Sequence, residues 1–252
     1  MIMIFIYKMK IIKEIIKKIL RKLSRVVFHL IPQELHTFFK IGEEKEKVYN
    51  YYTKKEILEC FNHFEKYLQN ALHLDNFNIR TYAIEKSLLN DKEKNKFYLE
   101  FGVFKGTSTN LFADYVKTIY GFDSFEGLRE DWAGFLLPKG HFNLNKKIPE
   151  LKSNVVPVVG WIQDTLEDFL KQHNPKINFV HVDVDTYETS LYILKSIKPY
   201  LDKNAIILFD ELYNFPGWRN GEYKALQETF NENEYKFRAF SISGMEVVIQ
   251  LN

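Results

Sequence analysis

Short apolar runs alternate with amphipathic stretches along the second half of the chain. Runs rich in β-branched and aromatic residues are typical of strands, and apolar positions that recur every three or four residues are typical of helices. The strand-like runs are FYLEF (97–101), TIYGF (118–122), VVPVV (155–159), INFVHVDV (177–184) and AIILF (205–209). Because helical stretches separate them, the pattern predicts a mainly parallel sheet with helices on both faces.

Two further strand-like runs close the chain. YKFRAFSI (235–242) and MEVVIQL (245–251) are separated only by a turn that contains Ser243 and Gly244. A parallel pair needs a crossover of a dozen or more residues, so the last strand must be antiparallel. The seven runs therefore predict an α/β fold with a seven-stranded, mainly parallel sheet.

The N-terminal part of the chain is helical in character. Residues 53–72 and 78–89 carry helical periodicity without internal proline or glycine, and predict a helical lead-in over 32–95. Before it, residues 1–31 contain an amphipathic helix with lysines and arginines on its polar side. Its apolar positions are Ile12, Ile15, Ile16, Ile19, Leu20, Leu23, Val26, Val27 and Leu30. No Gly/Ser-rich or Pro-rich linker divides residues 96–252, so we expect one domain there.

Two interpretations of the basic helix remain open. It packs on the domain or on a second subunit of a homo-oligomer, or it lies on an anionic membrane surface. No apolar run approaches the ~20 residues of a membrane span. The single cysteine, Cys60, fits a reducing cytoplasm. We therefore expect a cytoplasmic protein, bound peripherally at the inner face of the membrane under the second interpretation.

Composition and charge narrow the classes further. A chain of 252 residues with 46% hydrophobic residues can build one large core, which argues against disorder. The formal net charge of +2 creates no field that calls for a nucleic-acid partner. One cysteine allows neither an internal disulfide nor a thiolate metal cluster.

Glycine and acidic residues follow the first two strands of the domain, and open α/β sheets bind ligands beyond the carboxyl ends of their strands. Gly102 and Gly106 permit a tight turn and a close backbone approach to a ligand. Asp123 stands about 20 residues further on, where an acid accepts hydrogen bonds from ribose hydroxyls. This arrangement fits a nicotinamide cofactor or S-adenosylmethionine.

Four carboxylates follow the next two candidate core strands. Asp183 and Asp185 end one apolar run, and Asp210 and Glu211 follow the other. If the two strands are neighbours, their axes lie ~4.8 Å apart and the carboxylates converge and repel one another. A hard divalent cation such as Mg²⁺, Mn²⁺ or Ca²⁺ would relieve this repulsion, and the lack of a His or Cys cluster argues against zinc. Surface acids paired with lysines are the alternative.

Several of these motifs occur together and in a specific order. They are YLEFGVFKGTS, YGFDSFEGLREDW, KGHF, GWIQDTLEDFL, FVHVDVDTYETS and FDELYNFPGWRNGEYKAL. In this respect residues 97–230 resemble the macrocin O-methyltransferase group of class I S-adenosylmethionine-dependent methyltransferases. The resemblance implies a Rossmann-like fold, an S-adenosylmethionine cofactor and a Mg²⁺ or Mn²⁺ ion.

The resemblance also implies a role for individual residues. In the cofactor site, Asp123 binds the ribose with Ser124 beside it, and Thr107 and Ser108 lie near the methionine carboxylate. Asp185 matches the general base. The first cofactor motif contains Glu100, Gly102 and Gly106, and the adenine pocket contains Trp161, Gln163 and Asp164. The metal ligands are Asp183, Asp210 and Glu211. Asp183 also borders the cofactor. Some members have Asp where this chain has Glu211, so this ligand departs from part of the family.

The implied reaction is methylation of a hydroxyl group on a sugar, a sugar-containing metabolite or a glycan. The long segment 128–154 predicts a lid over this acceptor, with a structural insertion as the alternative. The aromatic loop 213–218 predicts either a second acceptor wall or a brace for the turn at Gly221 and Glu222. Two other classes are a nicotinamide-dependent oxidoreductase and a non-catalytic binding module. Hydride transfer does not require the carboxylate cluster, which argues against the oxidoreductase. The carboxylates are present at every motif position, which argues against a binding module that has lost its catalytic residues.

Overall fold

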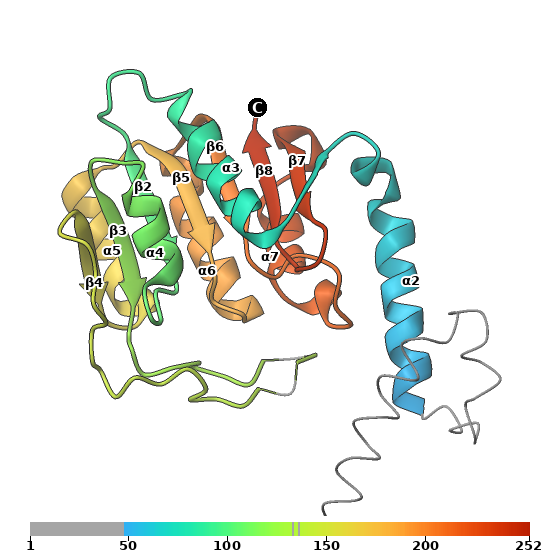
Figure 1. The fold of residues 1–252 in the computed structure, drawn as a ribbon. Coiled ribbons are helices and arrows are strands. Elements are labelled where there is room, and N and C mark those ends of the chain that lie inside the picture. Colours follow the sequence, from blue (N-terminus) through green and yellow to red (C-terminus); the bar gives the residue numbers. More distant parts are fainter. Residues whose placement is uncertain (1–47, 133, 136) are drawn as a thin grey trace, which may run out of the picture. The chain divides into compact units, whose positions relative to one another are not determined.

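The computed structural model describes residues 48–132, 134–135 and 137–252 (Figure 1). The predicted basic helix lies outside these described residues. Residues 50–252 form one compact unit. Among the described residues, no helix is both long and apolar enough to cross a membrane.

An eight-stranded sheet forms the centre of this unit (Figure 1). The strands lie in the order β1-β7-β8-β6-β5-β2-β3-β4. Their bounds are β1 (Leu72–Leu74), β2 (Phe97–Phe101), β3 (Ile119–Asp123), β4 (Val155–Val159), β5 (Ile177–Val182), β6 (Leu201–Phe209), β7 (Tyr235–Ser241) and β8 (Val247–Leu251). Only β8 runs against its neighbours β6 and β7, and the other neighbouring pairs are parallel. The predicted Rossmann-like α/β sheet with an antiparallel last strand is therefore confirmed.

The eighth strand, β1, comes from the lead-in that the sequence predicts as helical. The helix predicted over 53–72 ends instead at Leu68, and Leu72 pairs with Ala239 of the edge strand β7. Pairing with an exposed strand edge outweighs the helical periodicity of such a short segment. Helix α6 ends at Ile197, and a 3₁₀ turn that contains Pro199 follows, because proline cannot continue the helix.

Helices cover both faces of the sheet, as predicted (Figure 1). Side chains of α3 and α4 pack on one face in a core that includes Phe179 and Leu208. Side chains of α2, α5, α6 and α7 pack on the other face around Phe122 and Phe209. The helices are α2 (Val48–Leu68), α3 (Asn76–Leu88), α4 (Thr107–Ala113), α5 (Ile162–His173), α6 (Tyr187–Ile197) and α7 (Glu222–Thr229), with 3₁₀ turns η2 (Lys198–Tyr200), η3 (Trp218–Asn220) and η4 (Glu232–Glu234).

Helix α3 is held firmly at its start. The side chain of Asp75 accepts hydrogen bonds from the backbone N–H groups of Phe77 and Asn78, which satisfies donors that a helix start leaves open. Ile79 in the first turn is fully buried against the sheet. The residue that follows it, Arg80, is thereby fixed over the end of β6, where the site described below begins.

Candidate active site

The turn after β2 passes directly against the end of β5. Gly102 has φ of +92°, a region that side chains rarely adopt, and a Cβ atom there would lie 1.7 Å from the carbonyl oxygen of Asp183. Gly106, with φ of +77°, begins α4. Gly102 thus permits a close backbone approach, and the neighbour that it approaches is Asp183. A Cβ atom at Gly106 would instead meet the side chain of Leu151 at 2.6 Å.

Asp123 at the end of β3 organises this turn. Its Oδ2 accepts hydrogen bonds from the N–H groups of Val103 (2.9 Å) and Phe104 (2.7 Å), and its Oδ1 accepts one from Phe125 (2.7 Å). The carboxylate therefore connects the glycine turn to the end of the next strand. It also lies on the wall of the cavity described next.

A cavity of about 420 Å³ lies at the carboxyl ends of the strands, the position expected for an open α/β sheet. The predicted site residues on its wall are Gly102, Asp123, Ser124, Trp161, Gln163, Asp183, Asp185, Asp210 and Glu211. Five others are not part of this wall, namely Glu100, Gly106, Thr107, Ser108 and Asp164. Glu100 is fully buried below the cavity, and Asp164 is exposed in the first turn of α5.

The segment after β3 walls the cavity on the side away from the sheet. Leu128, Arg129, Trp132, Phe135, Leu137 and Phe142 all line the cavity. Trp132 stacks on Phe135 with 4.4 Å between ring centroids, and Phe135 lies 6.0 Å from Phe215 of the loop that follows β6. His141 is exposed and is not part of the wall. The predicted lid segment and the predicted aromatic loop are therefore in contact, through Trp132 and Phe135 on one side and Phe215 on the other.

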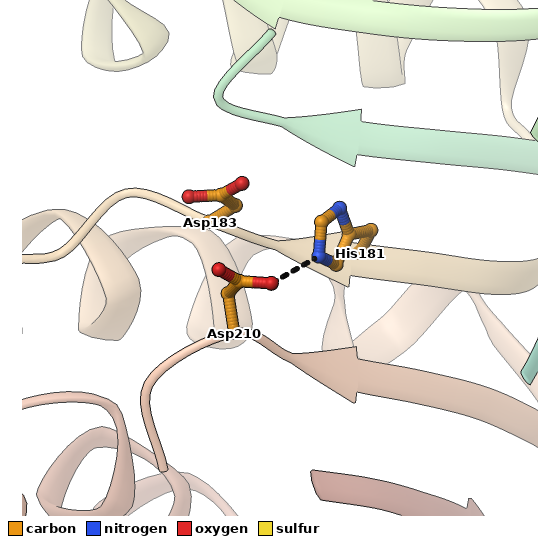
Figure 2. Close-up of side chains that lie close together, drawn as sticks. All are labelled: His181, Asp183 and Asp210. Carbon is orange, nitrogen blue, oxygen red and sulfur yellow. Dashed lines mark hydrogen bonds and ion pairs between the residues drawn. The ribbon is translucent and has the colours of Figure 1, made fainter. Parts of the chain in front are cut away.

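The carboxylates converge because β5 and β6 are neighbours, as the sequence argument requires. Val182 and Phe209 are opposite one another at the ends of these parallel strands, so Asp183 and Asp210 emerge side by side (Figure 2). Two groups have potential ligand atoms within 4.8 Å of one another. One contains His181, Asp183 and Asp210, and the other contains Asp183, Asp185 and Glu211. Asp183 belongs to both groups and so connects the other three predicted carboxylates, Asp185, Asp210 and Glu211. The predicted metal ligands Asp210 and Glu211 fall in different groups.

Burial and mutual repulsion set the charge state of three of these acids. Burial first, and the nearby Asp210 carboxylate second, raise the pKa of Asp185 to about 7. The same two causes raise the pKa values of Asp183 and Glu211 well above their ordinary values. Asp185 also has φ of +63°, an uncommon conformation for a residue other than glycine that often occurs at functional sites.

Asp210 differs because two cations contact it. Burial would raise its pKa, but a hydrogen bond to His181 and the charges of His181 and Arg80 hold it well below its ordinary value. Burial would likewise lower the pKa of His181, yet its hydrogen bonds to Asp210 and Glu100 raise it to about 10. His181 is therefore a buried imidazolium between two carboxylates, with Nδ1 2.9 Å from Glu100 Oε1 and Nε2 3.3 Å from Asp210 Oδ1.

Sequence reasoning missed His181, Arg80, Glu222 and Glu246. His181 lies two residues before Asp183, and side chains two apart on a strand share a face, so the HVDVD spacing could have indicated it. Glu222 of α7 is fully buried, and its Oε2 accepts a hydrogen bond from the N–H of Glu211 (3.0 Å). No local pattern connects Arg80 or Glu246 to the site.

The donor set fits a hard divalent cation. The available ligands are carboxylate oxygens, the type that Mg²⁺ and Mn²⁺ prefer. Oε2 of Glu211 is buried and has no hydrogen-bond partner among the described residues. A buried carboxylate oxygen without a partner is costly, and a bound cation would remove that cost.

Comparisons with known proteins agree with this geometry. Residues 99–212 match the model of a family described as a methyltransferase domain. A crystal structure of CalS11, described as a calicheamicin methyltransferase, is 20% identical with a TM-score of 0.55, and the alignment covers 83% of this chain and 97% of that one. An apo structure of CalS11 is 19% identical with a TM-score of 0.51, covering 86% of this chain and 90% of the other. A comparison with curated protein sequences gave no match.

The matched segment extends from β2 past the end of β6, and so includes the glycine turn and all four carboxylates. The fold likeness extends beyond this segment, because the alignment covers 83% of the chain. Domain and fold together indicate a methyltransferase domain on a Rossmann-like fold. A methyltransferase domain does not fit the nicotinamide-dependent oxidoreductase.

Proposed function

We propose that the chain methylates a hydroxyl group of a sugar or a sugar-containing metabolite or glycan, with the assistance of Mg²⁺ or Mn²⁺. The observation that carries the proposal is the carboxylate cluster on the wall of the cavity. The solved structure of CalS11 supports the choice of acceptor, because that protein is described as a TDP-rhamnose 3′-O-methyltransferase. The resemblance to the macrocin O-methyltransferase group points to the same chemistry.

The cofactor would occupy the half of the cavity next to β2, β3 and α5. Asp123 would accept hydrogen bonds from the ribose, with Ser124 beside it, and Trp161 and Gln163 would border the adenine. Glu100, Gly102 and Gly106 would shape the turn, Thr107 and Ser108 would lie toward the methionine carboxylate, and Asp164 would flank the adenine pocket. When bound, S-adenosylmethionine supplies a methyl group that its sulfonium already activates.

The acceptor would occupy the half of the cavity next to the carboxylates. Asp183, Asp210 and Glu211 would hold the divalent cation, which when bound supplies a Lewis acid that favours the alkoxide form of a hydroxyl group. Asp185, whose carboxylate lies on the wall of the cavity beside the proposed metal ligands, would take the hydroxyl proton as a general base. S-adenosylmethionine would supply the methyl group and leave as S-adenosylhomocysteine, and the product would be a methyl ether.

Positioning accounts for the rest of the chemistry. A hydroxyl held in line with the methyl group reacts without the entropic barrier of a bimolecular encounter. The Trp132–Phe135 stack and Leu137 provide apolar faces for the carbon-bound hydrogens of a sugar ring. The contact between Phe135 of the predicted lid and Phe215 supports a cover over the acceptor, which would limit the access of water.

The proposal is tested with S-adenosylmethionine labelled at the methyl group and a panel of nucleotide-linked sugars that includes TDP-rhamnose. We expect label in a sugar methyl ether, loss of transfer in EDTA, and recovery on addition of Mg²⁺ or Mn²⁺. Label on nitrogen or carbon of an acceptor would refute the O-methyltransferase assignment. Full turnover by protein stripped of metal would refute the metal role alone.

A further inference from the structure

Arg80 lies outside the segment that matches the methyltransferase domain, yet it contacts the carboxylate cluster. Its Nη2 is 2.5 Å from Oδ1 of Asp210 and 3.2 Å from Oε1 of Glu246. The side chains of Arg80 and Asp210 are 22% and 17% exposed, and that of Glu246 is 4% exposed. The contact is thus largely removed from water, which makes it stronger and more directional than a surface ion pair.

Asp210 is held at one oxygen from two sides. Arg80 approaches Oδ1 from α3, and His181 approaches the same oxygen from β5, as Figure 2 shows for the imidazole. His181 is itself fixed by Glu100 of β2. A carboxylate held in this way at Oδ1 has a fixed orientation, and Oδ2 is the oxygen left to bind a ligand from the cavity.

We propose that Arg80 is a positioning residue for the metal site, acting through Asp210. This inference rests on the metal role in the proposed function. Groups that hydrogen-bond to a metal ligand orient it before the metal arrives, and their loss typically weakens metal binding 10- to 100-fold. The lead-in helix α3 therefore supplies part of the active site, although its residues precede the matched domain.

Removing Arg80 alone would mix two opposite effects. The loss of its positive charge favours cation binding, whereas the loss of its hydrogen bond frees Asp210. It would also leave Glu246 buried without its partner, which is strongly destabilising. The effect of charge can be separated from the effect of the lost hydrogen bond, because Glu246 contacts the same Nη2 atom of Arg80. Neutralising Glu246 together with Arg80 leaves the total charge unchanged and leaves no buried charge without a partner.

The double variant Arg80→Met/Glu246→Gln removes one positive and one negative charge, so the net charge of the cluster is unchanged. Glu246→Gln alone leaves Arg80 on Asp210 and measures the effect of one unit of charge. Arg80→Lys keeps the charge but has one ammonium group in place of the planar fork. Arg238→Met removes a positive charge that contacts Gln250, outside the cavity wall, and serves as the control.

The measurement is Mn²⁺ binding to the full chain, followed by electron paramagnetic resonance, with S-adenosylmethionine binding by calorimetry on the same samples. We expect Mn²⁺ affinity to fall at least tenfold in the double variant and several-fold in Arg80→Lys. Affinity for S-adenosylmethionine should stay within twofold of wild type in both, which shows that the fold is intact. Arg238→Met should match the wild type in both measurements.

The possible results separate this inference from the proposed function. Wild-type affinity for Mn²⁺ in both the double variant and Arg80→Lys overturns the role of Arg80 and leaves the metal site standing. A wild-type protein that binds no Mn²⁺ or Mg²⁺ overturns the metal site and the role of Arg80 with it. If the double variant does not fold, Arg80→Lys decides, because only the positioning role predicts a loss when the charge is kept.

Discussion

Replacing Gly102 with alanine tests the central geometric feature of the site, the close approach of the glycine turn to β5. An alanine there must adopt φ near +92°, which costs an L-residue roughly 1–2 kcal/mol. Its Cβ would also lie 1.7 Å from the carbonyl oxygen of Asp183, so one backbone segment must move. Overpacking of this kind adds about 1–3 kcal/mol.

The expected loss of unfolding free energy for Gly102→Ala is therefore about 2–5 kcal/mol. For a domain of this size, each kcal/mol lowers Tm by roughly 2–4 °C. The free energy of unfolding is measured by urea denaturation followed by circular dichroism, and Tm by calorimetry. Binding of S-adenosylmethionine should weaken as well, because the displaced turn is hydrogen-bonded to Asp123.

Gly140→Ala is the matched control. Gly140 has φ of +82°, close to that of Gly102, but a Cβ atom there would meet nothing within 4 Å. The control shares the conformational cost and lacks the clash, so the difference between the two variants measures the clash. If Gly102→Ala is no less stable than Gly140→Ala, the close approach to Asp183 does not constrain the fold and the argument fails.

Three further predictions concern the cofactor, the chemistry and the N-terminal helix. Asp123→Ala should weaken S-adenosylmethionine binding at least tenfold by calorimetry, about 1.4 kcal/mol, and unchanged affinity in the folded variant would remove Asp123 from the cofactor site. Asp185→Asn should lower the rate about 10²–10⁴-fold without rescue by added metal, as loss of a general base does, whereas Asp210→Asn should lower metal affinity and recover partly in excess metal. Identical responses of the two variants to metal would contradict their separate roles. Removing residues 1–30 should abolish salt-sensitive binding to anionic liposomes and leave cofactor binding unchanged. If the full-length protein does not bind such liposomes at low salt, the helix is a packing element.

The order of elements could be predicted from the sequence because it depends on local periodicity. Period-two and period-3.6 patterns need only a few neighbouring residues, so β2 to β8 and the helices between them follow from the sequence. The positions of Asp183 and Asp210 at strand ends follow in the same way, because each comes directly after an apolar run. Their placement side by side required only that β5 and β6 be neighbours, which the structure confirms.

The partners of these acids are a matter of tertiary structure. Arg80 and Asp210 are 130 positions apart, and Glu222 reaches Glu211 only because α7 packs under the end of β6. The strand β1 likewise exists only because β7 presents an edge with which it can pair. Local periodicity specifies which face of an element is apolar, but the neighbour of each buried charge depends on how helices pack across the sheet. The sequence by itself therefore determined the fold class and the acidic site, and the packing of α3 and α7 decided which charges surround each carboxylate.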